Sequence, residues 1–148
     1  MRRHVLLILG CVALVGFAPA PFPKTERHRG DDPTDVNGTW EFELYAMSGT
    51  AQEGLKKQHR IEMTKEQFVF VDNSNSASRT TYAMRLDPAA SPPSFTWSMN
   101  NTVMFVGSYR LQKDQMTMIF RFGNSVTNRP TDFAGKPEYH YVLRRIKR

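Results

Sequence analysis

The stretch FVGSYRLQKDQMTMIFRF, residues 105–122, decides the fold. Apolar or small side chains occupy every second position on both sides of the polar segment 112–115. Because side chains of a β-strand point to alternate faces, each half is predicted to be a strand with one apolar face. The polar segment is too short to hold a crossover helix, so the two strands must pair antiparallel.

Six further segments have strand character. Five show the same alternation, and residues 67–71 are apolar on both faces. They are residues 39–44, 60–64, 67–71, 81–86, 95–98 and 139–146. Turn-forming residues separate most of them, which predicts eight strands in an antiparallel meander. Two connections are longer: residues 48–57 are expected to form an open loop or one helical turn, and residues 123–138 an irregular loop that covers an open end.

A meander of eight strands has unpaired edges unless its first strand bonds to its last. The predicted fold is therefore all-β, an eight-stranded antiparallel up-and-down barrel. Its expected inner face is bulky, with Gly107 as the only small member: Trp40, Phe42, Tyr82, Phe95, Trp97, Phe105, Tyr109, Phe120 and Phe122. This predicts a packed lumen, or at most a narrow pocket at one end that an adaptable methionine lining opens to a small apolar ligand.

The first 35 residues carry the features of export. Arg2 and Arg3 precede the apolar run 5–18, and Ala18-Pro19-Ala20 resembles a cleavage motif, so residues 1–20 are predicted to be a signal peptide. Residues 21–35 have linker composition, and the barrel domain is expected over 36–148. Pro21 disfavours cleavage and the residues before Cys11 loosely resemble a lipoprotein box, so a periplasmic or extracellular protein with an uncleaved or lipidated anchor stays an alternative.

Cysteine usage and charge exclude several kinds of site. Cys11 is the only cysteine, so the barrel domain has no disulfide and no thiolate. The formal net charge of +6 favours anionic surfaces without defining a site. The basic cluster at 144–148 is either a solvated strand end or an anionic contact. Tyr109-Arg110 and the Phe120 region interleave rings with arginines, but strand alternation explains them, so no nucleic-acid partner is expected.

No catalytic constellation is found in the sequence. Of four histidines, only His59 and His140 lie in the domain, and no further ligands accompany them, so we expect no metal and no cofactor. Glu41 and Glu43 share the strand face opposite Trp40, which predicts solvent exposure instead of a carboxylate pair. We therefore expect no catalytic residues.

The loop segment Arg129-Pro130-Thr131-Asp132-Phe133 allows two interpretations. Arg129 could receive a carboxylate or sulfate at the barrel mouth. Alternatively, Arg129 and Asp132 pair while Phe133 plugs the end of the barrel. The candidate ligand-binding residues are Arg129, Asp132 and Tyr109.

Gly38-Thr39-Trp40 on the first strand, with Arg144 or Arg145 on the last, resembles the Gly-x-Trp and arginine pair of the lipocalins. The resemblance implies a structural lock in which the arginine lies over the indole and closes one end of the barrel. The candidate residues of this structural lock are Gly38, Trp40 and either Arg144 or Arg145.

A second resemblance covers most of the domain. Residues 37–40, 107–120, 129–133 and 141–145 are similar to a family of small exported proteins abundant in planctomycetes, and the leader 17–24 looks planctomycete too. The family implies a lipocalin-like barrel and no assigned activity. Residues 80–98 depart from its usual pattern.

The expected function is a noncatalytic exported barrel that binds a small apolar or anionic ligand or a partner in the cell envelope. A purely structural envelope domain is the alternative, and a secreted enzyme comes third. A cavity of a few hundred Å³ under the loop 123–138 would favour binding. A lumen filled by its aromatic side chains would favour surface contacts.

Overall fold

The computed structural model describes residues 35–147. The predicted signal peptide 1–20 lies outside the described residues, as do residues 21–34 of the predicted linker. The elements are β1 (Gly38–Met47), β2 (Thr50–Ala51), α1 (Glu53–Gln58), β3 (His59–Met63), β4 (Gln67–Asp72), β5 (Arg79–Asp87), β6 (Ser94–Met99), β7 (Thr102–Gln112), β8 (Gln115–Phe122), the 3-10 turn η1 (Val126–Asn128) and β9 (Tyr139–Arg145). None of the described helices is long and apolar enough to cross a membrane.

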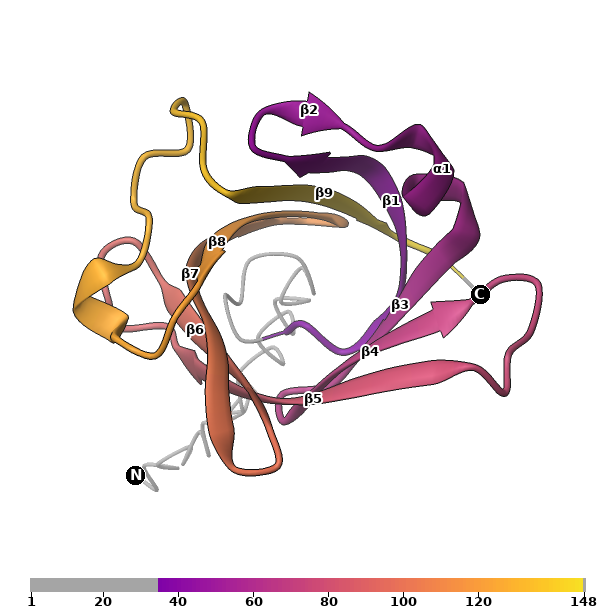
Figure 1. The fold of residues 1–148 in the computed structure, drawn as a ribbon, viewed down its shortest axis with the longest axis horizontal. Helices are drawn as coiled ribbons and strands as arrows, with labels where there is room; N and C mark the ends of the chain where they lie inside the picture. Colours follow the sequence, from indigo (N-terminus) through magenta and orange to yellow (C-terminus); the bar gives the residue numbers. More distant parts are fainter. Residues whose placement is uncertain (1–34, 148) are drawn as a thin grey trace, which may run out of the picture.

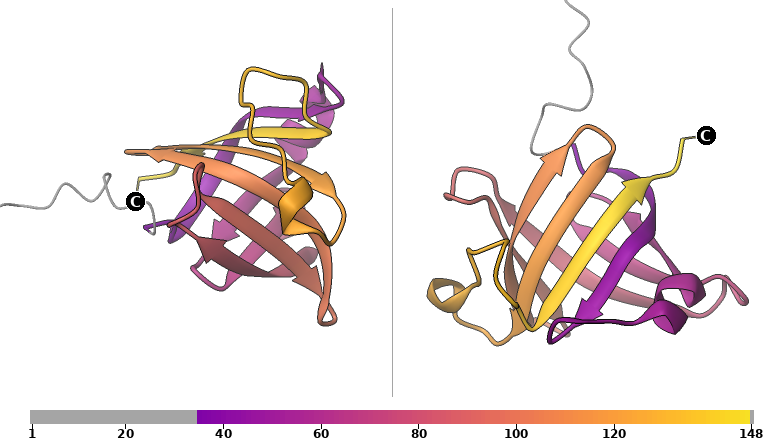
Figure 2. Two further views of the ribbon diagram at one scale, coloured as in Figure 1. Left: turned by 90° about the vertical axis from the view of Figure 1, so that its left-hand side faces the viewer. Right: turned by 90° about the horizontal axis from the view of Figure 1, so that it is seen from above.

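The strands form one antiparallel sheet in the order β2-β1-β3-β4-β5-β6-β7-β8-β9, and β1 also pairs with β9. The two-residue β2 adds only to the end of β1, so the other eight strands close into the predicted up-and-down barrel. Figure 1 looks along this ring of strands, and Figure 2 shows it from the side. All eight predicted strands are present, which confirms the fold class.

The hairpin of residues 105–122 has the predicted antiparallel register. Gly107 lies opposite Phe120, and Gln112 lies opposite Gln115 across the turn. Residues 48–57 form β2 and most of α1, so the helical alternative for this connection is the correct one.

Side chains fill the middle of the lumen. Trp97 and Phe120 are 1% exposed, and Tyr109 is fully buried. A Cβ atom on Gly107 would lie 2.5 Å from the carbonyl oxygen of Ile119, so the wall admits no side chain there. The packed-lumen prediction is thus correct for this part of the barrel.

Phe122 lies on the predicted inner face, opposite Phe105 and with its ring 5.6 Å from that of Phe105, but it is 55% exposed. The pairing of β8 with β9 ends at Phe120 and Tyr139, so the last two residues of β8 have no neighbour on β9. A register shift also interrupts β1, where Phe42 pairs with Leu143 and Leu44 with Val142. This bulge moves Tyr45 into the lumen, against Tyr141.

Candidate functional site

The end of the barrel where β1 begins and β9 ends is closed by a lock of Trp40 and Arg145. The guanidinium carbon of Arg145 lies 4.6 Å from the centre of the Trp40 ring, as the predicted stack requires. The indole nitrogen donates a hydrogen bond to the carbonyl oxygen of Val36 at 3.1 Å. Arg145 donates to the carbonyl oxygens of Asn37, at 2.8 Å, and Asp35, at 2.5 Å. The segment 35–37 is therefore held across this end.

Of the two candidate arginines, the lock uses Arg145. Arg144 points outward from β9 and forms an ion pair with Glu43. Gly38 has a φ of +145°, which residues with a Cβ rarely adopt, while a Cβ there would meet only ordinary contacts with Arg145. Backbone conformation, and not space, therefore selects glycine at position 38.

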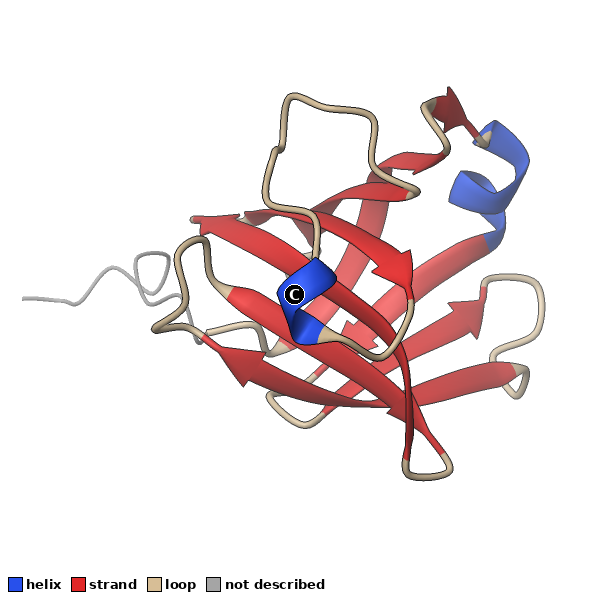
Figure 3. Cartoon of the chain, turned by 60° about the vertical axis from the view of Figure 1, so that its left-hand side comes forward, coloured by secondary structure: helices blue, strands red, loops and turns tan. Residues whose placement is uncertain are grey.

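The loop 123–138 lies on the outer wall of the barrel and not over its end, which corrects the expectation from sequence. The Ser108 hydroxyl, on the outward side of β7, donates to the carbonyl oxygen of Pro130 at 2.7 Å. The guanidinium carbon of Arg110, also outward, lies 4.0 Å from the centre of the Phe133 ring. Figure 3 shows η1 and the adjoining loop in front of the strands, outside the barrel. The apolar outer side chain of Ile119 on this wall is fully buried, which explains why the loop packs here.

The residues predicted from the loop do not meet a lumen. Arg129 donates to the carbonyl oxygen of Val126 at 3.3 Å, and Asp132 accepts from the amide of Ala134 at 2.9 Å. Both contacts are local turn interactions, and within the described residues Arg129 and Asp132 form no ion pair with each other. Phe133 plugs no barrel end, because it stacks on an outward arginine. Tyr109 is buried in the lumen wall and not available to a ligand from solvent.

The opposite end of the lumen carries a ring of half-buried aromatic side chains that we call the aromatic rim. It consists of Tyr45, Phe70, Tyr82, Phe105 and Tyr139. These rings rest on fully packed ones: the Tyr82 ring stacks 5.7 Å from Trp97, and the Tyr139 ring stacks 4.8 Å from Phe120. The rim side chains are thus partly buried, whereas the aromatic side chains beneath them are fully packed.

The aromatic rim and the neighbouring Tyr141 bring several tyrosine hydroxyls to this end of the barrel. Burial raises the pKa of Tyr82, Tyr139 and Tyr141 above the ordinary value, and neighbouring tyrosines add to the effect. A hydrogen bond with Tyr45 also raises the pKa of Tyr141. These hydroxyls remain neutral at physiological pH and can donate hydrogen bonds to a polar atom of a ligand.

The long connections leave the rim uncovered. Figure 1 shows α1 and the loop 123–138 outside the ring of strands. The helix contacts β1 and β3 and buries none of its own residues. Sequence reasoning found Tyr82 and Phe105 but missed Tyr45, because a bulge in β1 changes which face its side chains occupy.

A pocket of about 270 Å³ opens on the outer wall beside the loop 123–138, and we call it the outer pocket. It is lined by Arg110, Gln112, Gln115, Thr117, Phe133, His140 and Val142. Burial lowers the pKa of His140 below its ordinary value, so the imidazole is neutral at neutral pH. No acidic side chain lines the outer pocket.

A larger groove of about 700 Å³ lies next to it, toward the locked end, and shares Gln112 and Gln115 with the outer pocket. Four of its charged side chains form two ion pairs, Glu43 with Arg144 and Asp114 with Lys147 at 2.8 Å. A hydrogen bond from Gln115, followed by the contact with Arg144, lowers the pKa of Glu43, and the hydrogen bond from Lys147 lowers the pKa of Asp114. The groove therefore presents compensated charge and little unsatisfied binding capacity.

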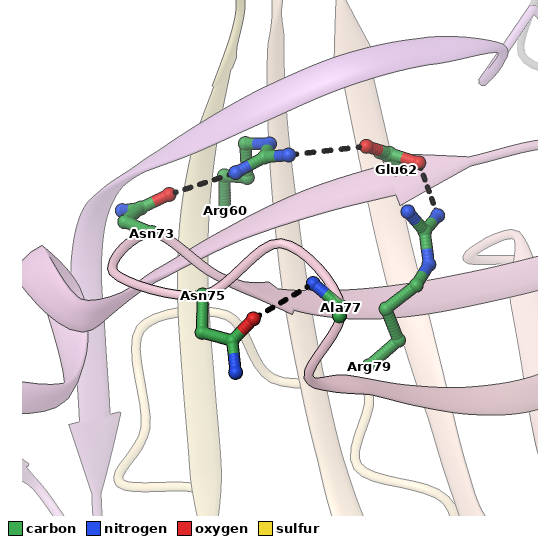
Figure 4. Close-up of polar contacts among 6 residues, drawn as sticks. All are labelled: Arg60, Glu62, Asn73, Asn75, Ala77 and Arg79. Atoms are coloured by element: carbon green, nitrogen blue, oxygen red, sulfur yellow. Dashed lines mark hydrogen bonds and ion pairs between the residues drawn. The ribbon is translucent and has the colours of Figure 1, made fainter.

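A third group of charges lies on the outside of β3, β4 and β5 (Figure 4). Glu62 forms ion pairs with Arg60, at 3.5 Å, and with Arg79, and Arg60 donates to the side-chain oxygen of Asn73 at 3.4 Å. The neighbouring outward Val71 is fully buried. The network is thus a brace across three strands and leaves no cation unpaired.

The two histidines of the domain belong to different places. His140 lines the outer pocket, whereas the Nδ1 of His59 donates a hydrogen bond to the carbonyl oxygen of Leu55 at 3.2 Å. Among residues 35–147, no group of three potential metal-ligating side chains occurs.

The chain matches no protein-family model, no curated protein and no solved structure.

Proposed function

We propose that the protein is a noncatalytic, exported binding barrel that takes a small, ring-bearing apolar ligand on its aromatic rim. The proposal keeps the likeness to the exported planctomycete family as its context. The observation that carries it is the difference in burial along the inner face. Aromatic side chains in the middle of the lumen are buried, while five at one end are half-buried.

The packed middle limits where a ligand binds. Trp97, Tyr109 and Phe120 occupy the space that a deep ligand would need, so the ligand lies on top of them. A flat ring placed there would stack on or meet the edges of the rim side chains, which is the arrangement that aromatic groups prefer. Covering their exposed parts removes apolar surface from water, which favours binding.

The tyrosine hydroxyls add a polar preference. Tyr82 and Tyr139 are partly buried and neutral, so they donate hydrogen bonds without the cost of burying a charge. A ligand with one or two hydrogen-bond acceptors on an apolar ring system fits this surface better than a pure hydrocarbon does.

A structural envelope domain without ligand remains the second candidate function. The packed lumen supports it, because a barrel that only holds other parts together needs no cavity. The two candidates differ in one respect: the scaffold leaves the aromatic rim empty, and the binding barrel does not.

The rim proposal can be tested with N-phenyl-1-naphthylamine, a neutral aromatic probe whose fluorescence rises in apolar surroundings. We expect saturable binding by the full-length protein. Tyr139→Ala should weaken it about tenfold, since one aromatic contact is worth roughly 0.5–1.5 kcal/mol beyond its buried area. Phe133→Ala, which removes a half-buried ring from the outer wall, is the matched control and should leave the affinity unchanged.

Native mass spectrometry of protein purified from its own cells then looks for a retained ligand. An added mass that is lost in Tyr139→Ala would support the proposal. Folded protein that neither retains a ligand nor binds the probe would contradict it and favour the scaffold.

A further inference from the structure

Arg110 has no acidic partner among the residues that the structure describes. It points outward from the middle of β7, and its one side-chain contact within the described residues is the stack on Phe133, at 4.0 Å. Other arginines on the outside of the barrel form ion pairs, such as Arg79 with Glu62 and Arg144 with Glu43. The guanidinium of Arg110 thus presents its N–H groups to the outer pocket with no carboxylate to neutralise them.

The stack fixes how those N–H groups are presented. Phe133 covers one face of the planar guanidinium, and planarity leaves the N–H groups pointing outward from its edge. A guanidinium held in this way loses less conformational entropy on binding than a free one. Its fork of parallel N–H groups matches the two oxygens of a carboxylate, or two oxygens of a phosphate or sulfate.

The remaining walls of the outer pocket suit the same kind of ligand. Thr117 and Gln112 carry hydrogen-bond donors, and the neutral His140 has one ring N–H to donate. Gln115 uses its amide group to donate to Glu43, at 2.6 Å, so that carboxylate is engaged away from the pocket. Donors from three strands therefore converge on one side of the barrel wall, with no acceptor carrying a negative charge among them.

The outer pocket also has an apolar side. Phe133 and Val142 line it next to the polar groups. A volume of about 270 Å³ is near the lower limit of ordinary ligand pockets, which is enough for a small molecule and too small for a polymer segment. The walls thus fit one anionic group joined to a small apolar body.

We propose that the outer pocket is a binding site for a small organic oxyanion, with Arg110 as the bidentate receptor and Phe133 as the residue that orients it. Thr117 and His140 supply further hydrogen bonds, and Val142 contacts the apolar part of the ligand. This site lies on the opposite side of the barrel wall from the aromatic rim, and it does not depend on the function proposed for that rim.

The site can be tested by NMR on ¹⁵N-labelled full-length protein at low ionic strength. Sodium benzoate, inorganic phosphate and sulfate serve as separate probes, with sodium chloride as the reference for general ionic effects. We expect saturable shifts at Arg110, Thr117 and His140 with at least one oxyanion and none with chloride. Benzoate as the strongest probe would indicate a carboxylate ligand, whereas phosphate or sulfate would indicate an ester of either acid.

Two glutamine variants separate a built site from general attraction to a basic protein. Arg110→Gln should weaken binding at least about tenfold, because it removes the charged hydrogen bonds to the oxyanion. Arg121→Gln makes the same charge change on the outside of β8, beyond the pocket lining, and should change the affinity less than about twofold, as expected for a distant exposed charge. Arg110→Lys, which keeps the charge and loses the fork, should resemble Arg110→Gln.

Equal weakening by Arg110→Gln and Arg121→Gln would overturn the proposal, since binding would then follow net charge alone. Shifts confined to residues outside the outer pocket would overturn it as well. Loss of probe binding at the aromatic rim, with oxyanion binding intact, would remove the function proposed for the rim and leave this site in place.

Discussion

The two ends of the barrel solve the same problem in different ways. Each end has a large aromatic side chain at the edge of the packed lumen, and the two ends shield that side chain from solvent to different extents. At the locked end, Trp40 is fully buried beneath a guanidinium and a short backbone segment. At the other end, Tyr139 and its neighbours cover one another only in part.

The difference separates stability from binding. At the locked end, the indole N–H and the two terminal nitrogens of the guanidinium donate to backbone carbonyls, while the Arg145 Nε is buried without a hydrogen-bond partner among the described residues. The side chains of the aromatic rim are only partly buried, so a ligand can contact them from the solvent. Substitutions at the lock should therefore lower stability, and substitutions at the rim should alter binding with a smaller effect on stability.

The largest effect is expected from Trp40→Ala. Removing a fully buried indole leaves a cavity, and such changes cost about 3–5 kcal/mol in the free energy of unfolding. Urea denaturation of the variant and of the parent protein measures this value. Tyr139→Ala at the rim should cost clearly less, and an equal or greater cost at Tyr139 would remove the distinction between the two ends. If Trp40→Ala does not fold, Trp40→Phe provides the same comparison with a smaller cavity.

Arg145→Gln should come next. It removes the cation–π contact with Trp40 and the charged hydrogen bonds to the carbonyl oxygens of Asp35 and Asn37. A hydrogen bond of this kind contributes roughly 1.5–3 kcal/mol to the free energy of unfolding. Thermal or urea unfolding gives the loss. Arg144→Gln is the matched control, because the neighbouring side chain is 62% exposed and its pair with Glu43 should contribute only about 0–1 kcal/mol. A similar loss of stability in Arg145→Gln and Arg144→Gln would show that the lock stabilises the protein no more than an exposed ion pair does.

A third test lies between the ends, at Gly107. An added methyl group would lie 2.5 Å from a backbone oxygen and 2.6 Å from the Cβ of Phe120, so Gly107→Ala should cost about 1–3 kcal/mol through overpacking. Gly54→Ala is the control: no atom lies within 4 Å of the added Cβ, and alanine in α1 should stabilise by up to about 1 kcal/mol. A neutral Gly107→Ala would mean that the middle of the lumen is not tightly packed.

The sequence predicted the fold because alternation and short turns leave few choices. Eight strands that each have an apolar face, joined in order, leave no exposed edge only if the sheet closes. The lock was expected from the resemblance of Gly38-Thr39-Trp40 and a terminal arginine to the lipocalin pair. The same reasoning chose correctly between lumen packing and a roomy cavity, because Gly107 was the only small residue on the inner face.

The sites could not be predicted in the same way. A bulge near Leu44 shifts Tyr45 to the inner face, and nothing in the alternation of that strand signals it. The outer pocket exists because a long loop folds onto the wall, where Phe133 meets Arg110, two residues that lie on different elements. Local periodicity predicts faces of strands, but contacts between a loop and a distant strand depend on tertiary packing.

The aromatic rim should also make the stability of the protein depend on pH in alkaline solution. The pKa values of Tyr82, Tyr139 and Tyr141 are raised by burial, so the folded protein keeps their protons at a pH where the unfolded chain, with tyrosine pKa values near 10, releases them. Because the folded state then binds more protons than the unfolded state, this contribution is fully present below pH 10 and stability falls as the pH rises above it.

Absorbance at 295 nm, which follows tyrosinate, measures the effect in folded and urea-unfolded protein. Tyr82, Tyr139 and Tyr141 should ionise at higher pH in the folded protein than in the unfolded protein. Bound N-phenyl-1-naphthylamine should delay Tyr82 and Tyr139 further, because a ligand on the aromatic rim excludes water from both hydroxyls. A delay that the probe leaves unchanged would place the probe away from the rim, and identical titrations of folded and unfolded protein would mean that the rim hydroxyls are as solvated as free tyrosine.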